Sequence, residues 1–330
     1  MQNNFLTGKK ILVTGGAGFI GSNLVERLLE LNNNVVCLDN LSTGKMKNLK
    51  ELLSKPDFKF IHGDIRDLKT CKDACEDIEI VFHQAALGSV PRSINDPITT
   101  NSTNIDGFLN MLVAAKDAKV KRFIYAASSS TYGDSQELPK VEDRIGKPLS
   151  PYAITKYVNE LYAKVFADLY GMECIGLRYF NVFGKNQDPE GPYAAVIPKF
   201  IKILINHQSP VINGDGNQTR DFTYIENVIQ ANLLAATVEN KKAINTVYNV
   251  ACGQSTSLNE ITEVLIKLLS KFDPEISKIK PIYGPERAGD VRNSLASIEK
   301  SKNLLGYKPT HVFTKGIEEA VNWYYYNLKR

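Results

Sequence analysis

Short apolar runs alternate with amphipathic stretches over the first half of the chain. The apolar runs are Ile11–Val13, Val35–Leu38, Phe58–Ile61, Ile80–Phe82, Arg122–Ala126 and Glu173–Leu177. Apolar residues with helical spacing follow the first run, over Asn23–Leu31. Apolar strands separated by helices are typical of a parallel sheet that is covered on both faces. We therefore expect an α/β fold with a doubly wound parallel sheet, which binds ligands beyond the carboxyl ends of its strands.

The pattern loosens after about Asn181. Turn residues cluster at 184–192, 213–217 and 283–285, and helical spacing returns over Leu258–Ser270 and Thr314–Leu328. We expect a parallel-sheet domain over residues 1–181 and a smaller mixed α/β lobe over residues 182–330, with strands of the second allowed to cross back to the first. The cleft between the lobes is the expected ligand site.

Composition narrows the class of protein. The chain has 330 residues and a formal net charge of +4, with Lys and Arg interspersed among Asp and Glu. This charge pattern argues against a nucleic-acid partner, and no run approaches the roughly 20 apolar residues of a membrane span. The N-terminus lacks the basic start and apolar core of a signal peptide, so we expect a cytoplasmic protein. The five cysteines are odd in number, and Cys71 and Cys75 have no nearby His or second Cys pair, which predicts neither disulfides nor a metal site.

A glycine-rich turn follows the first strand and opens a helix. Its glycines, Gly15, Gly18 and Gly21, have the spacing G-x-x-G-x-x-G. Glycine permits a tight turn and lets backbone N–H groups approach a pyrophosphate at the helix N-terminus. The turn has a strand before it, a helix after it and an acid, Asp39, at the end of the next strand. This context predicts a dinucleotide site rather than a plain turn.

Asp39 favours NAD over NADP. A carboxylate accepts hydrogen bonds from two ribose hydroxyls but repels a 2′-phosphate. No Arg adjoins Asp39, although Lys45 is near it in the sequence. Asp64, after the third strand, has two interpretations that the sequence leaves open: contact with the adenine, or a turn in a loop.

Tyr152 and Lys156 are four residues apart at the start of a helical stretch, so both side chains lie on one helix face. An ammonium group beside a phenol lowers the phenol pKa, which makes Tyr152 a candidate proton acceptor. Ser128, Ser129 and Ser130 end the preceding strand, at the ligand edge of the sheet. The alternatives are an amphipathic surface helix and serines that merely cap a strand end, but the upstream nucleotide turn favours catalysis.

Together these features resemble the extended short-chain dehydrogenase/reductase family, and within it the nucleotide-sugar 4-epimerases of the UDP-galactose epimerase type. The resemblance runs nearly end to end. It is carried by Thr14–Gly21, His83–Ala86, Ser128–Gly133, Tyr152–Lys156, Arg178–Gly184, Arg220–Phe222 and Arg287–Asp290. It implies a Rossmann domain with a smaller substrate lobe, NAD as cofactor and a UDP-sugar as substrate.

The resemblance also implies roles for individual residues. Ser128 would hold the sugar 4-hydroxyl, Tyr152 would take its proton, and Lys156 would orient the nicotinamide ribose and lower the pKa of Tyr152. The implied cofactor contacts are Gly15, Gly18, Phe19, Ile20, Gly21, Asp39, Asn40, Ser42, Thr43, Gly44, Asp64, Ile65, Gln84, Ala85, Ala86, Thr103, Tyr152, Lys156 and Tyr179, with Phe180 also beside the nicotinamide. The implied substrate contacts are Gly88, Ser89, Ser128, Ser129, Ser130, Asn181, Gln187, Ala195, Val196, Asn213, Arg220, Arg287, Asp290 and Ser294. Asn181, Arg220 and Arg287 would grip the diphosphate, and Asp290 would lie near the uridine ribose.

The implied reaction needs no external reductant. The C4 hydride passes to NAD, the 4-keto sugar turns over, and hydride and proton return to its other face. A 4,6-dehydratase would need an acid and a base beside Ser128, and a decarboxylating relative would carry Glu at Ser130, whereas this chain has Ser129 and Ser130 there. A non-catalytic NAD-bound sensor or scaffold is the alternative from another class, and the presence of Ser128, Tyr152 and Lys156 weighs against it.

The sugar is inferred from Ser294. In related epimerases restricted to UDP-glucose and UDP-galactose, a bulky Tyr stands at this position, so Ser leaves room for an N-acetyl group at C2. Leu87–Ser93, Ser129 and Ser130 also resemble epimerases that prefer N-acetylated sugars, and Gly88 and Ala195 are small. We expect interconversion of UDP-N-acetylglucosamine and UDP-N-acetylgalactosamine. The alternatives are an exposed loop position for Ser294, UDP-glucose and UDP-galactose as substrates, or a UDP-uronic acid whose carboxylate meets Arg92.

Relatives often form dimers through a four-helix bundle. The resemblance therefore implies a homodimer that uses the helices near Asn101–Ala118 and Tyr152–Tyr170.

Overall fold

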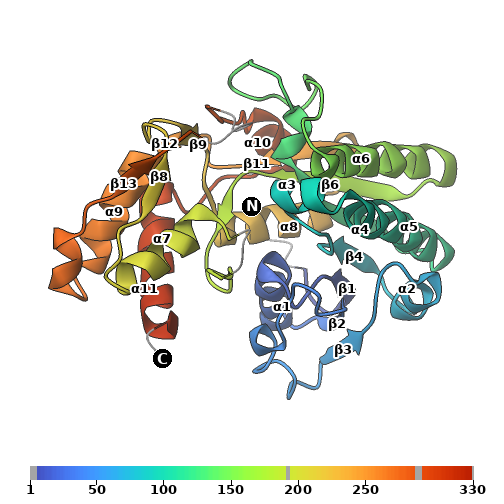
Figure 1. Ribbon diagram of the computed structural model, residues 1–330. Coiled ribbons are helices and arrows are strands. Elements are labelled where there is room, and N and C mark those ends of the chain that lie inside the picture. Colours follow the sequence, from blue (N-terminus) through green and yellow to red (C-terminus); the bar gives the residue numbers. More distant parts are fainter. Residues whose placement is uncertain (1–5, 191–193, 287–291, 329–330) are drawn as a thin grey trace.

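One parallel sheet organises the molecule (Figure 1). The computed structural model describes residues 6–190, 194–286 and 292–328. In the described residues, seven strands join in the order β11-β6-β5-β4-β1-β2-β3, and every pair is parallel. Their bounds are β1 Lys10–Thr14, β2 Asn34–Asp39, β3 Phe58–His62, β4 Ile80–His83, β5 Arg122–Ser128, β6 Glu173–Tyr179 and β11 Thr246–Val250. The expected doubly wound parallel sheet is confirmed.

Helices cover both faces of the sheet and build the second lobe. The helices of the first half are α1 Phe19–Glu30, α2 Leu68–Ala74, α3 Val90–Asn95, α4 Pro97–Asn101, α5 Gly107–Asp117 and α6 Pro151–Tyr170. Those of the second half are α7 Val196–Ile205, α8 Ile225–Thr237, α9 Leu258–Leu269, α10 Glu299–Leu305 and α11 Phe313–Leu328. The first helix begins at Phe19, earlier than the Asn23 expected from apolar spacing, because the glycine turn itself leads into its first turn.

Each strand sends alternate side chains into two separate cores. Ile11, Val13, Ile124 and Ala126 belong to the core shared with α1 and α8. Leu12, Phe123, Tyr125 and Ala127 belong to the core shared with α2, α5 and α6. Side chains alternate between the faces of a strand, so a sheet covered on both sides needs runs that are apolar at every position. This explains the uninterrupted apolar runs in the sequence.

The sheet is completed from the second half of the chain. β11 pairs with β6, from Thr246 opposite Ile175 to Val250 opposite Tyr179. α8 packs against β5, β6 and β11 and against α1. In Figure 1 both elements lie among those of the first half, although the chain enters the second lobe before it reaches them. The sequence analysis identified neither element, because α8 carries only a weak apolar stripe and the polar Asn249 interrupts the apolar residues of β11.

The ligand edge of the sheet lies at the carboxyl ends of β1 and β4. The chain order reverses there, because β1 is followed by β2 on one side and lies next to β4 on the other. This reversal keeps the connections on opposite faces and leaves a crevice above the strand ends. Thr14 Oγ1 and His83 Nδ1, from the last residues of the two strands, are 2.9 Å apart and close the bottom of this crevice.

Among the described residues, the second lobe contains three two-stranded sheets and three helices that pack together. β8 Val211–Asn213 pairs with β13 Ile282–Gly284, and β9 Thr219–Arg220 pairs with β12 Thr256–Ser257. α7, α9 and α11 pack together, and β7 Val182–Phe183 pairs with β10 Thr223–Tyr224 where the chain enters the lobe. None of the described helices has the length and apolarity that a membrane crossing requires.

Polar links tie the start of the second lobe to the first domain. Lys45 forms an ion pair with Asp188, and Lys185 forms one with Glu26 at 2.6 Å. Asn186 Nδ2 donates to the hydroxyl of Ser22 at 3.1 Å. These links hold the 185–188 segment against α1 and the loop after β2, at one end of the crevice.

Candidate active site

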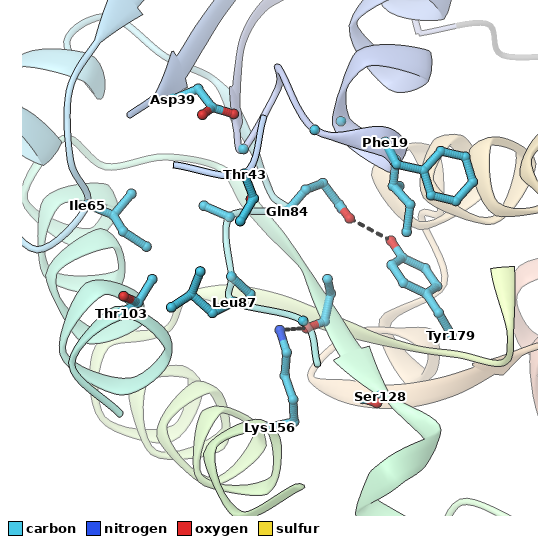
Figure 2. Close-up of a pocket in the computed structure, with 18 of the residues that line it drawn as sticks. Phe19, Asp39, Thr43, Ile65, Gln84, Leu87, Thr103, Ser128, Lys156 and Tyr179 are labelled. Atoms are coloured by element: carbon cyan, nitrogen blue, oxygen red, sulfur yellow. Dashed lines mark hydrogen bonds between the residues drawn. The ribbon is translucent and has the colours of Figure 1, made fainter. Parts of the chain in front are cut away.

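A cleft of about 510 Å³ lies above the carboxyl ends of the sheet strands. Residues from the ends of β1, β2, β4, β5 and β6 line it, together with residues of α1 and α6 (Figure 2). It therefore occupies the crevice at the reversal of strand order, where α/β sheets bind ligands.

The glycine turn is shaped for close backbone approach. Gly15 has φ +68°, and a Cβ there would lie 2.7 Å from the backbone of Ala85. A Cβ on Gly21 would lie 2.1 Å from the carbonyl oxygen of Gly15. No larger residue fits at either position, so the turn stays tight and the N-terminus of α1 opens into the cleft. These features fit a dinucleotide pyrophosphate.

Asp39 holds the turn and also faces the cleft. One carboxylate oxygen accepts from the backbone N–H of Ala17 at 2.9 Å, and the other accepts from that of Leu41 at 2.8 Å. Burial raises the pKa of Asp39, while these two backbone hydrogen bonds act in the opposite direction. The carboxylate is thus fixed at the end of β2, where a ribose-binding group is required.

Asp64 behaves as a loop residue. Its carboxylate accepts from Arg66 and from Asn40 Nδ2, at 2.7 Å and 2.8 Å. The hydrogen bond from Arg66 is the main reason that the pKa of Asp64 is held far below its usual value. The neighbours Gly63 and Ile65 line the cleft instead.

Ser128, Tyr152 and Lys156 come together in the cleft. α6 begins with Pro151, and the hydroxyl of Ser150 caps it by accepting from the N–H of Ala153 at 3.1 Å. This start places Tyr152 and Lys156 on the face of α6 toward β5. Ser128, Tyr152 and Lys156 all line the cleft.

The pKa of Tyr152 departs from the sequence expectation. Burial raises it, and the hydrogen bond from Ser128 is the influence that lowers it. Lys156 Nζ instead donates to the carbonyl oxygen of Ala126 at 2.8 Å, a contact drawn in Figure 2. Burial also lowers the pKa of Lys156, to about 8. Lys156 is therefore not the group that lowers the pKa of Tyr152, contrary to the expectation.

Asn104 joins the catalytic helix to the loop after β4. It lies in a short π-helical segment, Ser102–Asp106, between α4 and α5. Its side chain accepts from the N–H of Leu87 at 2.8 Å, donates to the carbonyl of Leu87 at 3.2 Å, and donates to Thr155 at 3.1 Å. The widened helical turn aims this amide at both partners and fixes the wall of the cleft.

Most of the residues expected at the cofactor line the cleft. They are Gly15, Gly18, Phe19, Ile20, Gly21, Asp39, Asn40, Ser42, Thr43, Ile65, Gln84, Ala85, Ala86, Thr103, Tyr152, Lys156 and Tyr179. Gly44 packs behind the wall, against Ala17 and Asp39. Phe180 is fully buried in a small core with Tyr132 and does not line the cleft.

The residues expected at the substrate are more dispersed. Gly88, Ser128, Ser129 and Asn181 line the cleft. Gly88, Gln187 and Ala195 line an adjoining cleft of about 970 Å³, which shares Gly18, Phe19, Ser42 and Thr43 with the first. The structure places Ser89, Ser130, Val196, Asn213, Arg220 and Ser294 in neither cleft, and Arg287 and Asp290 lie outside the described residues.

Several of these residues have local structural partners. Ser89 caps α3, and Ser130 Oγ donates to Ser128 Oγ at 2.9 Å. Arg220 donates to the carbonyl of Thr219 at 2.9 Å, and the N–H of Ser294 donates to the same carbonyl at 3.1 Å. Arg220 and Ser294 therefore lie side by side at the edge of the second lobe.

Six lining residues were missed by the sequence analysis: Leu38, Gly63, Leu87, Ala126, Ala127 and Val182. Most are apolar and belong to strand ends or to the residues just after them. An apolar residue in a strand is first interpreted as part of the hydrophobic core. Only its position at the carboxyl end of the strand could have indicated that it also lines the cleft.

Comparisons with known proteins place this geometry in a family. Residues 11–251 match the NAD dependent epimerase/dehydratase family. A UDP-N-acetylglucosamine 4-epimerase from Methanobrevibacter ruminantium M1, solved with UDP-N-acetylmuramic acid, has 40% identity and a TM-score of 0.91, covering 98% of this chain and 100% of that one. A UDP-glucose 4-epimerase from Thermotoga maritima, solved with UDP-glucose, has 36% identity and a TM-score of 0.89, with 97% and 99% coverage. A UDP-glucuronate 4-epimerase from Thermodesulfobacterium geofontis is 36% identical over 328 residues, covering 96% of this chain and 97% of the relative. With its nucleotide cleft and its Ser-Tyr-Lys arrangement, the chain belongs to the NAD-dependent epimerase/dehydratase family, and its cofactor is NAD.

Proposed function

We propose that this protein is a UDP-sugar 4-epimerase that interconverts UDP-N-acetylglucosamine and UDP-N-acetylgalactosamine. The observation that carries the reaction type is that Ser128, Tyr152 and Lys156 meet in the nucleotide cleft. Tyr152, which can transfer a proton, and Ser128, which can bind a hydroxyl, thus lie together beside the residues expected to bind NAD.

The chain's residues supply the acid–base half of the chemistry. NAD, when bound, supplies the acceptor and later the donor of the C4 hydride. Ser128 holds the 4-hydroxyl, and Tyr152 takes its proton as the C4–H bond breaks. The intermediate is a 4-keto sugar, which rotates to present its other face while the second lobe holds the diphosphate. Tyr152 then returns the proton as hydride reaches the opposite face of C4, so the net change is inversion at C4.

The pKa of Tyr152 bears directly on this proton transfer, because only the phenolate can take the proton. Burial raises the pKa of Tyr152 and so opposes the phenolate, whereas the side chain of Ser128 lowers the pKa. The buried ammonium of Lys156 lines the same cleft.

Room around the cleft supports an N-acetylated sugar. Gly88 borders both clefts, and a Cβ added there would meet no heavy atom within 4 Å. Ala195 is the small residue on the opposite wall of the second cleft. The Methanobrevibacter relative, which acts on an N-acetylated sugar by its description, supports the same choice. Ser294 adds to it by resemblance only.

A UDP-uronic acid is the second candidate. Arg92 lines the second cleft beside Gly88, and a guanidinium group suits a carboxylate at C6. The Thermodesulfobacterium relative is a UDP-glucuronate 4-epimerase.

The test is a substrate panel. Purified protein is incubated separately with UDP-N-acetylglucosamine, UDP-glucose and UDP-glucuronic acid, and the products are resolved chromatographically. The proposal expects the highest kcat/KM for the N-acetylated sugar without added NADH. Replacing Ala195 by Tyr should suppress the N-acetylated sugar more than UDP-glucose, because Ala195 lines the second cleft and a filled pocket rejects added volume. A native preference for UDP-glucose, or an unchanged preference in the variant, would overturn the sugar assignment, and inactivity on all three would overturn the epimerase.

We also propose a homodimer. Ile154, Leu161, Val165 and Leu169 on α6 and Ile98 on α4 are exposed, from 47% to 82% of their surface, and α4 packs on α6. Aliphatic side chains that recur on one helix face mark an association surface. Light scattering should give twice the monomer mass, and replacing both Leu161 and Val165 by Lys should give the monomer. A monomeric native protein would exclude the dimer.

A further inference from the structure

A closed triangle of buried polar groups lies beneath the cofactor end of the cleft. It consists of Gln84 after β4, Tyr179 at the end of β6, and Asn232 on α8. Gln84 and Tyr179 line the cleft, whereas Asn232 is fully buried behind them. Figure 2 shows Gln84 and Tyr179 pointing toward one another.

Asn232 uses its whole hydrogen-bonding capacity in this arrangement. Its Nδ2 donates to the phenol oxygen of Tyr179 at 2.9 Å and to the carbonyl of Val228, one turn earlier in α8, at 2.8 Å. Its Oδ1 accepts from Gln84 Nε2 at 3.3 Å. The phenol of Tyr179 donates to Gln84 Oε1 at 3.2 Å. Each side chain is therefore held by the other two, and Asn232 is anchored to the backbone of its helix.

The surroundings show that this contact is a specific one. α8 packs on the sheet with apolar side chains such as Val228, Ile229 and Ala235, all buried in one core. A buried amide stabilises a core only when it is fully paired, and it then restricts the geometry of its partners. Asn232 adds little packing that Leu could not supply. What it adds is a fixed orientation for two side chains on the cleft wall.

We infer that Asn232 is a positioning residue, which holds Gln84 and Tyr179 in the orientation that grips the nicotinamide end of NAD. Asn232 itself lines neither of the two clefts. This inference rests on the proposed epimerase chemistry for the place of the nicotinamide, since the hydride must pass close to Ser128 and Tyr152. Asn232 thus links α8, from the second half of the chain, to retention of the cofactor.

The experiment compares two asparagines of the same helix. Asn232→Leu removes the triangle, and Asn227→Leu is the matched control. Asn227 is also fully buried in α8, but its side chain binds the backbone at Thr310 and His311, away from the cleft. NAD release from purified holoenzyme is followed by rapid dilution and ultrafiltration, and melting is recorded for each variant.

Leaving a buried phenol and amide without their partner should speed NAD release by about tenfold in Asn232→Leu. Asn227→Leu should melt at a lower temperature and release NAD at the native rate. Equal release rates in the two variants, whether native or raised, would overturn the inference, because the effect would then be absent or merely structural.

A second comparison tests the inference if Asn232→Leu does not fold. Asn232→Ser and Tyr179→Phe are measured singly and together. If Asn232 acts partly through the phenol, the double variant releases NAD more slowly than the product of the two single effects predicts, and fully multiplied effects would contradict the inference. NAD release is read without any sugar, so an inactive native enzyme would overturn the proposed function while leaving this result interpretable.

Discussion

Replacing Arg178 by Met should destabilise the protein strongly although the side chain lies outside the cleft. Its guanidinium donates to both carboxylate oxygens of Glu160, at 2.8 Å and 2.7 Å, and to the carbonyl of Glu142 at 2.9 Å. It also lies 4.9 Å from the centre of the Tyr132 ring. Arg178 is 2% exposed and Glu160 is 9% exposed, so the substitution leaves a carboxylate buried without its partner.

The expected loss follows from that unpaired charge. Removing one member of a buried ion pair typically costs about 3–5 kcal/mol of unfolding free energy. Glu160→Gln should lose a similar amount. The double variant, with Glu160 replaced by Leu and Arg178 by Met, carries no buried charge at this site. Its unfolding free energy should lie within about 2 kcal/mol of that of the native protein.

Urea unfolding, followed by circular dichroism with saturating NAD in every sample, measures the four proteins. The midpoint and the slope are compared, because a changed slope would indicate a changed unfolded or native state. A double variant as unstable as the sum of the single variants would refute the reasoning. The pair would then contribute net stability, and the loss could not be assigned to an uncompensated charge.

Three further outcomes are expected. Tyr152→Phe should lower kcat by about 10²–10⁴-fold while calorimetry shows nearly native UDP-sugar binding, since the phenol oxygen acts on the reacting proton; a native rate would require another base. Asp39→Asn keeps the size of the side chain but loses its charge, so less NAD should be released on denaturing the purified protein, and discrimination against NADP should fall; unchanged retention and selectivity would contradict the role of Asp39. Burial lowers the pKa of Lys156 to about 8, below the ordinary value of 10.5. Between these values the unfolded chain binds more protons, so this group's contribution to stability rises with pH. Cofactor-free Lys156→Met should therefore be more stable than the native protein at pH 7, by about 1–3 kcal/mol, and this gain should shrink toward pH 10; a gain that stays constant would show that Lys156 is not charged at pH 7.

The sequence predicted those parts of the site whose residues lie close together along the chain. Gly15, Gly21 and Asp39 are fixed by backbone geometry and by one strand end, and Tyr152 and Lys156 by one helix face. Their spacing along the chain is therefore enough to predict how they are arranged in space.

Residues that meet across the fold were not predictable in this way. Asn232 reaches Tyr179 from α8, and Asn104 reaches Leu87 from a π-helical turn, which apolar spacing does not reveal. The pKa of Tyr152 was misjudged because burial and the carbonyl of Ala126 depend on three-dimensional packing. Ser294 was placed by resemblance alone, and its backbone neighbour is Thr219 at the start of β9.

The late position of β11 has a consequence for how the protein is made. A ribosome releases β1 to β6 well before residues 246–250, so the growing chain presents β6 as an open sheet edge. Unpaired strand edges recruit other strands, including those of neighbouring nascent chains on the same message. Until Thr246–Val250 emerges and pairs with β6, we expect the incomplete chain to be more prone to aggregation than the finished protein. We therefore expect expression yield to depend on translation speed across the second lobe, a part of the chain that lies largely outside the nucleotide cleft.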